Sequence, residues 1–231
     1  MILTPIPRAA LPAALDRFAV QLQDRAASAA FARIRATSAD RAAGEEAERH
    51  RQLALAFAQR CGMAVHPAGH PCRFNWDGAA LDGSTEAYVI LHEIAHFVLA
   101  PPARRVLADF GLGPGPDTRD RDAARRAATL PFLAREEDEA LASLLGILWE
   151  AELGQPALAS FLDQNWLEGL DRSAAPHFAA TLDGLGHRGL VDRRARPVIR
   201  ARDPGSSARS GTVKADCGRR GDRASATGCG S

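Results

Sequence analysis

The chain has 231 residues, of which 46% are hydrophobic, and this is typical of one globular domain with an appendage. Its formal net charge is +1, so its overall charge gives no reason to expect nucleic acid or an anionic membrane surface as a partner. No run of about 18 apolar residues predicts a membrane span, and the first residues lack the basic and apolar regions of a signal peptide, so we expect a cytoplasmic protein.

The first 62 residues predict helices that form part of the same fold as the residues that follow. Residues 9–35 are rich in alanine and carry large apolar side chains at helical spacing, namely Leu11, Leu15, Phe18 and Leu22. A second helix is predicted over residues 40–61, and Gly62 is a favourable residue to end it. His50 on this helix is expected at the surface. We interpret both helices as scaffold.

Residues 62–83 are rich in glycine and proline and predict a loop. His66 and His70 fall in this loop, close to Cys72. A pair of loop histidines that lacks a third partner in the sequence pattern is more often solvated than bound to metal. The four cysteines form no CxxC pair, so the sequence supports neither a disulfide framework nor a zinc site built on cysteines.

A His-Glu-x-x-His motif within the apolar run 88–99 is the main chemical signal. His92 and His96 are four residues apart, so on a helix they share one face and can offer two imidazole nitrogens to one metal ion. Glu93 lies beside that face, where it can handle a proton of a metal-bound water. Ser84 or Thr85 is expected to cap this helix.

The helix with this motif is expected to end at Pro101-Pro102 and to be buried. A chance motif, or a pair of satisfied core histidines, is the alternative interpretation. Two buried imidazoles beside a buried carboxylate are costly without a metal or a dense hydrogen-bond network, so we favour the metal site. The segment 74–76 is expected to form a short strand or a loop that packs over it.

Two arginines follow this helix, and an acidic helix follows them after an exposed loop over residues 113–128. Arg104 and Arg105 are candidates to orient an anionic group of a substrate, although a solvated pair or a salt bridge is equally compatible with the sequence. The acidic helix is predicted over residues 135–153. Its residue 137 lies on the same face as the leucines at 141, 144 and 148, so Glu137 is predicted to point inward and to be the third metal ligand, with Glu136 and Glu139 as alternates.

These patterns predict a mainly α fold, in which a compact helical metalloprotein contains few or short strands, with a zincin-like core as a possibility. Residues 63–200 would form the metal-binding catalytic core. After about residue 200 the composition shifts to Gly, Ser, Arg, Ala and Asp, which predicts a disordered tail over residues 201–231.

The stretch from His92 to Gly111 resembles the core of the elongation factor P hydroxylase family, which has a similar metal-binding helix followed by an Arg-Arg pair and an Asp-Phe-Gly run. The acidic residues 136–139 resemble that family's second acidic helix, and residues 166–169 resemble its Asn-Leu-Glu-Gly segment. The similarity extends over residues 74–197. This chain departs from the family where Glu137, Asp138 and Glu139 replace a Lys-Pro-Gln run.

The resemblance implies that His92 and His96 bind the metal together with a glutamate from 136–139. It also implies hydroxylation of a modified lysine side chain on elongation factor P or a similar protein. Two imidazoles and one carboxylate serve Fe(II) in O₂ chemistry and Zn²⁺ in hydrolysis. We therefore favour an Fe(II)- and O₂-dependent monooxygenase, with a zinc-dependent metallopeptidase or hydrolase as the alternative. A non-catalytic helical adaptor with a structural metal is the third possibility.

Overall fold

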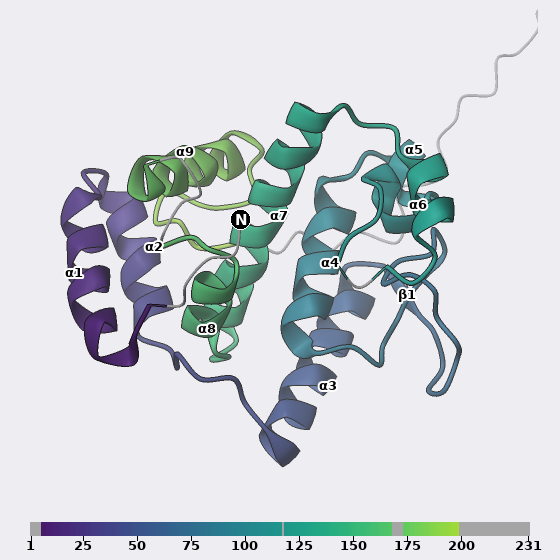
Figure 1. Cartoon of the computed structure of the whole chain (residues 1–231), viewed down its shortest axis with the longest axis horizontal. Coiled ribbons are helices and arrows are strands. Elements are labelled where there is room, and N and C mark those ends of the chain that lie inside the picture. Colours follow the sequence, from purple (N-terminus) through teal and green to yellow (C-terminus); the bar gives the residue numbers. More distant parts are fainter. Residues whose placement is uncertain (1–5, 117, 168–172, 199–231) are drawn as a thin grey trace, which may run out of the picture.

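The computed structural model describes residues 6–116, 118–167 and 173–198, and the fold of these residues is mainly helical (Figure 1). In chain order the elements are the 3-10 helix η1 (Arg8–Ala10), α1 (Leu11–Gln21), α2 (Arg25–Arg35), α3 (Gly44–Arg60), β1 (Ala64–Val65), β2 (Ala80–Leu81), α4 (Ala87–Leu99), α5 (Pro102–Arg105), the 3-10 helix η2 (Ala108–Gly111), α6 (Arg121–Ala127), α7 (Phe132–Glu152), α8 (Ala157–Asp163) and α9 (Ala174–His187). The two strands pair in parallel. The predicted mainly α class with short strands is therefore confirmed. Across the described ranges, every helix is too short or too polar to cross a bilayer.

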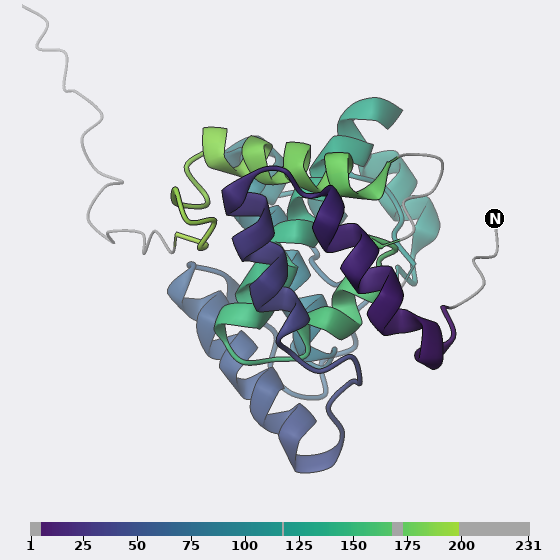
Figure 2. The same ribbon diagram turned by 90° about the vertical axis from the view of Figure 1, so that its left-hand side faces the viewer.

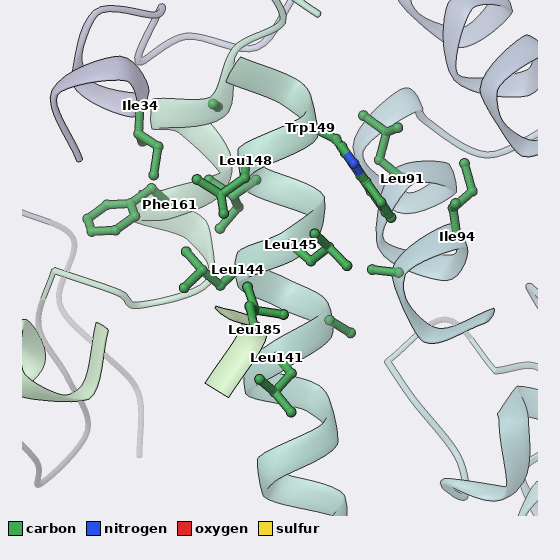
Figure 3. Close-up of a cluster of buried hydrophobic side chains, with 14 of the residues drawn as sticks. Ile34, Leu91, Ile94, Leu141, Leu144, Leu145, Leu148, Trp149, Phe161 and Leu185 are labelled. Carbon is green, nitrogen blue, oxygen red and sulfur yellow. The ribbon is translucent and has the colours of Figure 1, made fainter. Parts of the chain in front are cut away.

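Helix α7 runs through the middle of the molecule, with α4 on one side and α2, α8 and α9 on the other (Figure 1). Its second half is buried on all faces, because it packs against helices in both directions. Figure 3 shows Leu144 and Leu148 on the side of Phe161 in α8, whereas Leu145 lies on the side of Leu91 in α4. The leucine stripe used to orient this helix therefore faces away from α4.

A stripe of small side chains brings α7 close to α4. A Cβ atom on Gly146 would lie 3.3 Å from the Cα atom of His92 and 3.4 Å from its backbone nitrogen. Glu139, Ala142 and Gly146 share this face, since they follow the i, i+3, i+7 spacing of a helix. The face of α7 that approaches α4 at Gly146 therefore also carries Glu139.

The first two helices join the core through aromatic packing. Phe18 of α1 and Phe31 of α2 contact Phe161 of α8 and Phe178 of α9, with ring centroids 5.4–6.5 Å apart. Figure 2 shows α1 and α2 facing the viewer, with α9 lying across their upper ends. The predicted helix over residues 9–35 is in fact two helices. It breaks because the Asp24 carboxylate accepts a hydrogen bond from the Ala27 backbone at 2.6 Å and so starts a new helix.

Several local expectations differ from the structure. His50 is buried and not at the surface, because α3 packs against α4. Glu86 occupies the N-cap position of α4. The Ser84 hydroxyl donates a hydrogen bond to the Asp82 carboxylate and does not cap the helix. Part of the expected loop 113–128 is helix α6, whose first turn is capped by the Asp120 carboxylate.

Helix α4 ends at Leu99, and Ala100 separates it from the Pro101-Pro102 pair that was predicted to end it. The predicted tail over residues 201–231 and the residues Glu168 and Gly169 lie outside the described residues.

Candidate metal centre

Three side chains from two helices converge where α4 faces the start of α7. The Nε2 atoms of His92 and His96 are 3.0 Å apart. The Oε2 atom of Glu139 lies 3.5 Å from His92 Nε2 and 3.4 Å from His96 Nε2. The metal-ligating atoms of these three residues form one cluster that fits a single ion.

The spacing of these atoms fits a transition metal. Metal–nitrogen and metal–oxygen bonds of about 2.1 Å that meet at roughly 90–110° place their ligand atoms about 3.0–3.4 Å apart. The three observed separations fall in or next to this range. Two imidazoles and one carboxylate are borderline ligands that suit Zn²⁺ and Fe(II) alike. The residues present therefore fit a divalent metal, and they leave its identity open.

The prediction that Glu137 is the third metal ligand is wrong. Its Oε1 atom accepts a hydrogen bond from Arg188 Nη2 at 2.9 Å, and its side chain is 64% exposed, away from the histidines. Glu136 lines the neighbouring cavity, but the metal-ligand cluster of the described residues contains Glu139. The prediction failed because it oriented α7 by its leucine stripe, which faces α8, whereas its small residues face α4.

Asp138 supports the centre from outside the ligand set. Its Oδ2 atom lies 3.4 Å from His96 Nδ1, and its Oδ1 atom accepts a hydrogen bond from Arg104 Nη2 at 2.6 Å. A carboxylate at Nδ1 holds the proton there and leaves Nε2 free for a metal. Burial lowers the pKa of His96, but Asp138 and Glu139 outweigh burial and raise this pKa to about 10.

Asp138→Asn is expected to weaken metal binding by roughly 10–100-fold, the range seen when an outer hydrogen-bond partner of a ligand is lost. An asparagine has one acceptor oxygen, whereas His96 and Arg104 both need one. Competition titration with a chelator measures the change, and Glu137→Gln is the matched control on the same helix. An unchanged affinity in Asp138→Asn would remove Asp138 from the site.

The two arginines contact groups of the protein and do not line the cavity beside the histidines, which corrects their assignment as substrate-binding residues. Arg104 is buried against Asp138. The Arg105 Nε donates to the Ala100 carbonyl at 2.8 Å, and its guanidinium lies 4.7 Å from the centroid of the Phe97 ring. Neither lines the cavity described below. Arg104 orients the metal site, and Arg105 secures the C-terminal end of α4.

Glu93 is buried on the same helix and lines the same cavity as the two histidines. Its Oε1 atom accepts a hydrogen bond from Asn75 Nδ2 at 3.2 Å. Burial raises the pKa of Glu93, although the neighbouring histidines and Asn75 act in the opposite direction. The segment 74–76 thus packs over the site, as the sequence predicted, and its bridge between Trp76 and Leu81 gives it strand character.

The Asp109-Phe110-Gly111 run adds a second carboxylate and an aromatic wall. Asp109 and Phe110 have φ values of 45° and 53°, a left-handed conformation that is strained for residues with side chains. The Phe110 ring stacks against His96 and Trp76, with centroids 5.7 Å and 5.5 Å away. Burial raises the pKa of Asp109 to about 6, and the Thr118 hydroxyl donates to its carboxylate at 2.7 Å.

A cavity of about 390 Å³ opens beside the three converging side chains. Its walls come from α4, from η2 and the loop after it, and from α7 and α9. Besides His92 and His96, its lining includes the polar side chains of Ser143, Gln164, Asn165 and His177. The His177 ring stacks on the Trp166 ring, with centroids 5.1 Å apart. Among the described lining residues the formal charges are carboxylates, with no arginine or lysine.

Comparison of this chain with protein-family models, curated proteins and solved structures finds no match. The sequence pattern identified His92, Glu93 and His96, and it named Glu139 as an alternate ligand. It placed the segment 74–76 over the site without singling out Asn75, and it assigned no role in the site to Asp109 or Asp138. The small residues of α7 were a usable signal for Glu139 and its neighbour Asp138. Asn75 and Asp109 had no periodic signal, since both lie in irregular backbone.

Proposed function

We propose that this protein is a metal-dependent oxygenase that hydroxylates a lysine-type side chain of a protein substrate, most specifically elongation factor P. The observation that carries the proposal is the set of His92, His96 and Glu139 on the wall of the cavity. Fe(II) held by two imidazoles and one carboxylate supplies O₂ activation. The resemblance of residues 92–111 to the elongation factor P hydroxylase family adds the substrate class.

A carboxylate that remains free in the cavity supports a cationic substrate. Its lining carboxylates are Glu93, Asp109, Glu136 and Glu139. Glu139 and the histidines are committed to the metal, which leaves Glu136 at the start of α7 to receive an ammonium group. A lysine-type side chain combines such a group with an apolar stem, and the stem would pack against Val89 and Trp166 in the same cavity.

The shape of the site supports entry of a side chain and not of a main chain. Proteins often hold an extended peptide by adding it to the edge of a sheet. In the described ranges the paired strands span two residues each, and no residue of either strand lines the cavity. At about 390 Å³ the cavity is near the lower end of ligand pockets, which run to about 300–1,000 Å³.

The proposed reaction inserts one atom of O₂ into a C–H bond of the side chain and reduces the other atom to water. It consumes two protons and two electrons, and an external reductant supplies the electrons. Glu93, held by Asn75, has a pKa raised by burial and is placed to hold or transfer a proton beside the histidines. Asp109 offers a second carboxyl group whose pKa of about 6 allows both protonation states near neutral pH.

Zinc-dependent hydrolysis is the second candidate, and the position of Glu93 favours it. A buried glutamate with a raised pKa beside two histidines is suited to act as general base toward water. A structural metal without catalysis is less well supported, because structural zinc sites are usually closed by four protein ligands. The cluster found among the described residues has three and borders a cavity.

The test combines product mass with metal content. Elongation factor P from cells that contain this gene is expected to be one oxygen atom heavier than the same protein from cells that lack it. Protein purified without oxygen is expected to contain iron. Glu139→Gln is expected to abolish the mass gain, whereas the control Glu137→Gln keeps it. An unchanged mass, together with zinc in the site and peptide cleavage that is lost in Glu93→Gln, would contradict the hydroxylase and support the hydrolase.

A further inference from the structure

A second group of metal-ligating side chains lies in the loop between α3 and α4. His66, His70 and Cys72 each offer a ligand atom, and these atoms all lie within 4.8 Å of one another. The two imidazole rings stack, with centroids 4.0 Å apart and planes 13° apart. The three residues share no member with the centre formed by His92, and they do not line its cavity.

One acidic side chain orients a ligand of this cluster. The Asp77 Oδ2 atom lies 2.8 Å from His66 Nε2, which fixes the orientation of that ring. Carboxylates that orient a ligating side chain are the usual outer partners of a metal site.

The cluster is open to solvent on one side, since Cys72 is buried and His70 is exposed. The exposed ring of His70 beside the buried Cys72 gives an ion a route from solvent.

The loop contains little regular secondary structure. Residues 66–79 contain no helix or strand, and β1 and β2 on either side of them are two residues long. A metal bound to three side chains would add a further cross-link to this segment. Imidazole and thiolate are ligands that suit Zn²⁺.

We propose that His66, His70 and Cys72 bind a second metal ion, Zn²⁺, with Asp77 orienting His66 and water in the fourth position. The sequence places His66 and His70 close to Cys72, but a pair of loop histidines without a third partner in the pattern favoured solvated side chains. The structure supplies Cys72 as that partner. The proposal does not depend on the reaction at the first centre.

The loop that contains the second site also contacts the walls of the cavity at the first site. Asn75 lies three residues after Cys72 and donates the hydrogen bond that holds Glu93. The Cys72 carbonyl accepts a hydrogen bond from Arg119 Nη1 at 2.9 Å, next to the Thr118 that holds Asp109. A zinc ion at Cys72 would therefore stiffen two walls of the cavity at once.

The experiment counts metal ions in the full chain after saturation with Zn²⁺ and removal of loosely bound ion. The wild-type protein is expected to retain two ions per chain. Cys72→Ser and His70→Ala should each retain one, and Glu139→Gln should also retain one. His70→Ala guards against misfolding, since His70 is exposed and its removal creates no cavity. Cys61→Ser, at the end of α3, is the matched cysteine control and should retain two.

Cobalt substitution reports on the sulfur ligand directly. A sulfur-to-cobalt charge-transfer band is expected in the wild-type protein and in Glu139→Gln. It should be absent in Cys72→Ser and unchanged when Cys217 and Cys229 are both replaced by serine. One ion per chain in the wild-type protein, or a cobalt band that survives in Cys72→Ser, would overturn the second site without affecting the proposed function of the first.

Discussion

Glu139→Gln is expected to lose the metal of the first centre, with an affinity loss larger than the roughly 100-fold that removal of an outer hydrogen-bond partner costs. The change keeps the size of the side chain but removes the charge that faces both histidines at 3.4–3.5 Å. His92→Ala and His96→Ala should have the same effect, since two protein ligands are too few for tight binding. Elemental analysis after mild chelation is the measurement.

Glu137→Gln provides the matched control, because it makes the same chemical change two residues earlier on α7. Its carboxylate pairs with Arg188, and its side chain is exposed, so metal content should stay at the wild-type level. Equal metal loss in the two variants would point to damage of the helix and not to loss of a ligand. Full occupancy in Glu139→Gln would remove this residue from the centre.

The same contacts predict how metal binding depends on pH. Against the effect of burial, Asp138 and Glu139 raise the pKa of His96 to about 10, so the metal-free site binds a proton at neutral pH. A metal must displace this proton. The apparent affinity of the wild-type centre should therefore rise as the pH rises toward 10, and proton release should accompany binding.

The histidine pair was predictable because its geometry is local. Spacing along one helix puts His92 and His96 on one face whatever surrounds them. The third ligand, Glu139, was harder to predict, because its orientation depends on which face of α7 meets α4. A helix buried on both sides has no single apolar stripe, and Ala142 and Gly146, not the leucines, mark the face of closest approach.

The remaining parts of both sites come together only through tertiary structure. Asn75, Asp109 and Cys72 sit in irregular backbone, where no periodicity predicts which way a side chain points. Arg104 was predicted to bind substrate because an arginine close to the helix of the metal-binding motif can orient an anionic group. Its partner Asp138 lies 34 residues away in the sequence, so local pattern could not reveal the pair.

A buried carboxyl group outside the cavity of the metal centre gives the second large prediction. Glu150 on α7 is 2% exposed and accepts a hydrogen bond from the Ser160 hydroxyl at 2.7 Å, with Arg41 Nη1 at 3.8 Å. Burial raises its pKa from 4.5 to about 8, because the bond to Ser160 and the charge of Arg41 compensate only part of the lost hydration. The group therefore binds a proton in the folded protein over a range where the unfolded chain has released it.

The sign of the effect follows from this difference in bound protons. Between pH 4.5 and about 8 the folded state holds the proton and the unfolded state does not, so the free energy of unfolding falls as the pH rises. Each unit of pKa difference corresponds to about 1.4 kcal/mol, so the full loss is on the order of a few kcal/mol above pH 8. It is absent below pH 4.5, where both states are protonated.

Glu150→Gln is expected to remove this loss, because glutamine resembles the protonated carboxyl group in size and can still accept the Ser160 hydrogen bond. The variant should be more stable than the wild-type protein by a few kcal/mol at pH 9 and nearly equal to it at pH 4.5. Urea unfolding at equal metal loading measures both values. The exposed Glu137→Gln should show no such pH-dependent gain. If Glu150→Gln is instead destabilised at pH 9, the carboxylate is ionised in the fold and its pair with Arg41 outweighs the effect of burial.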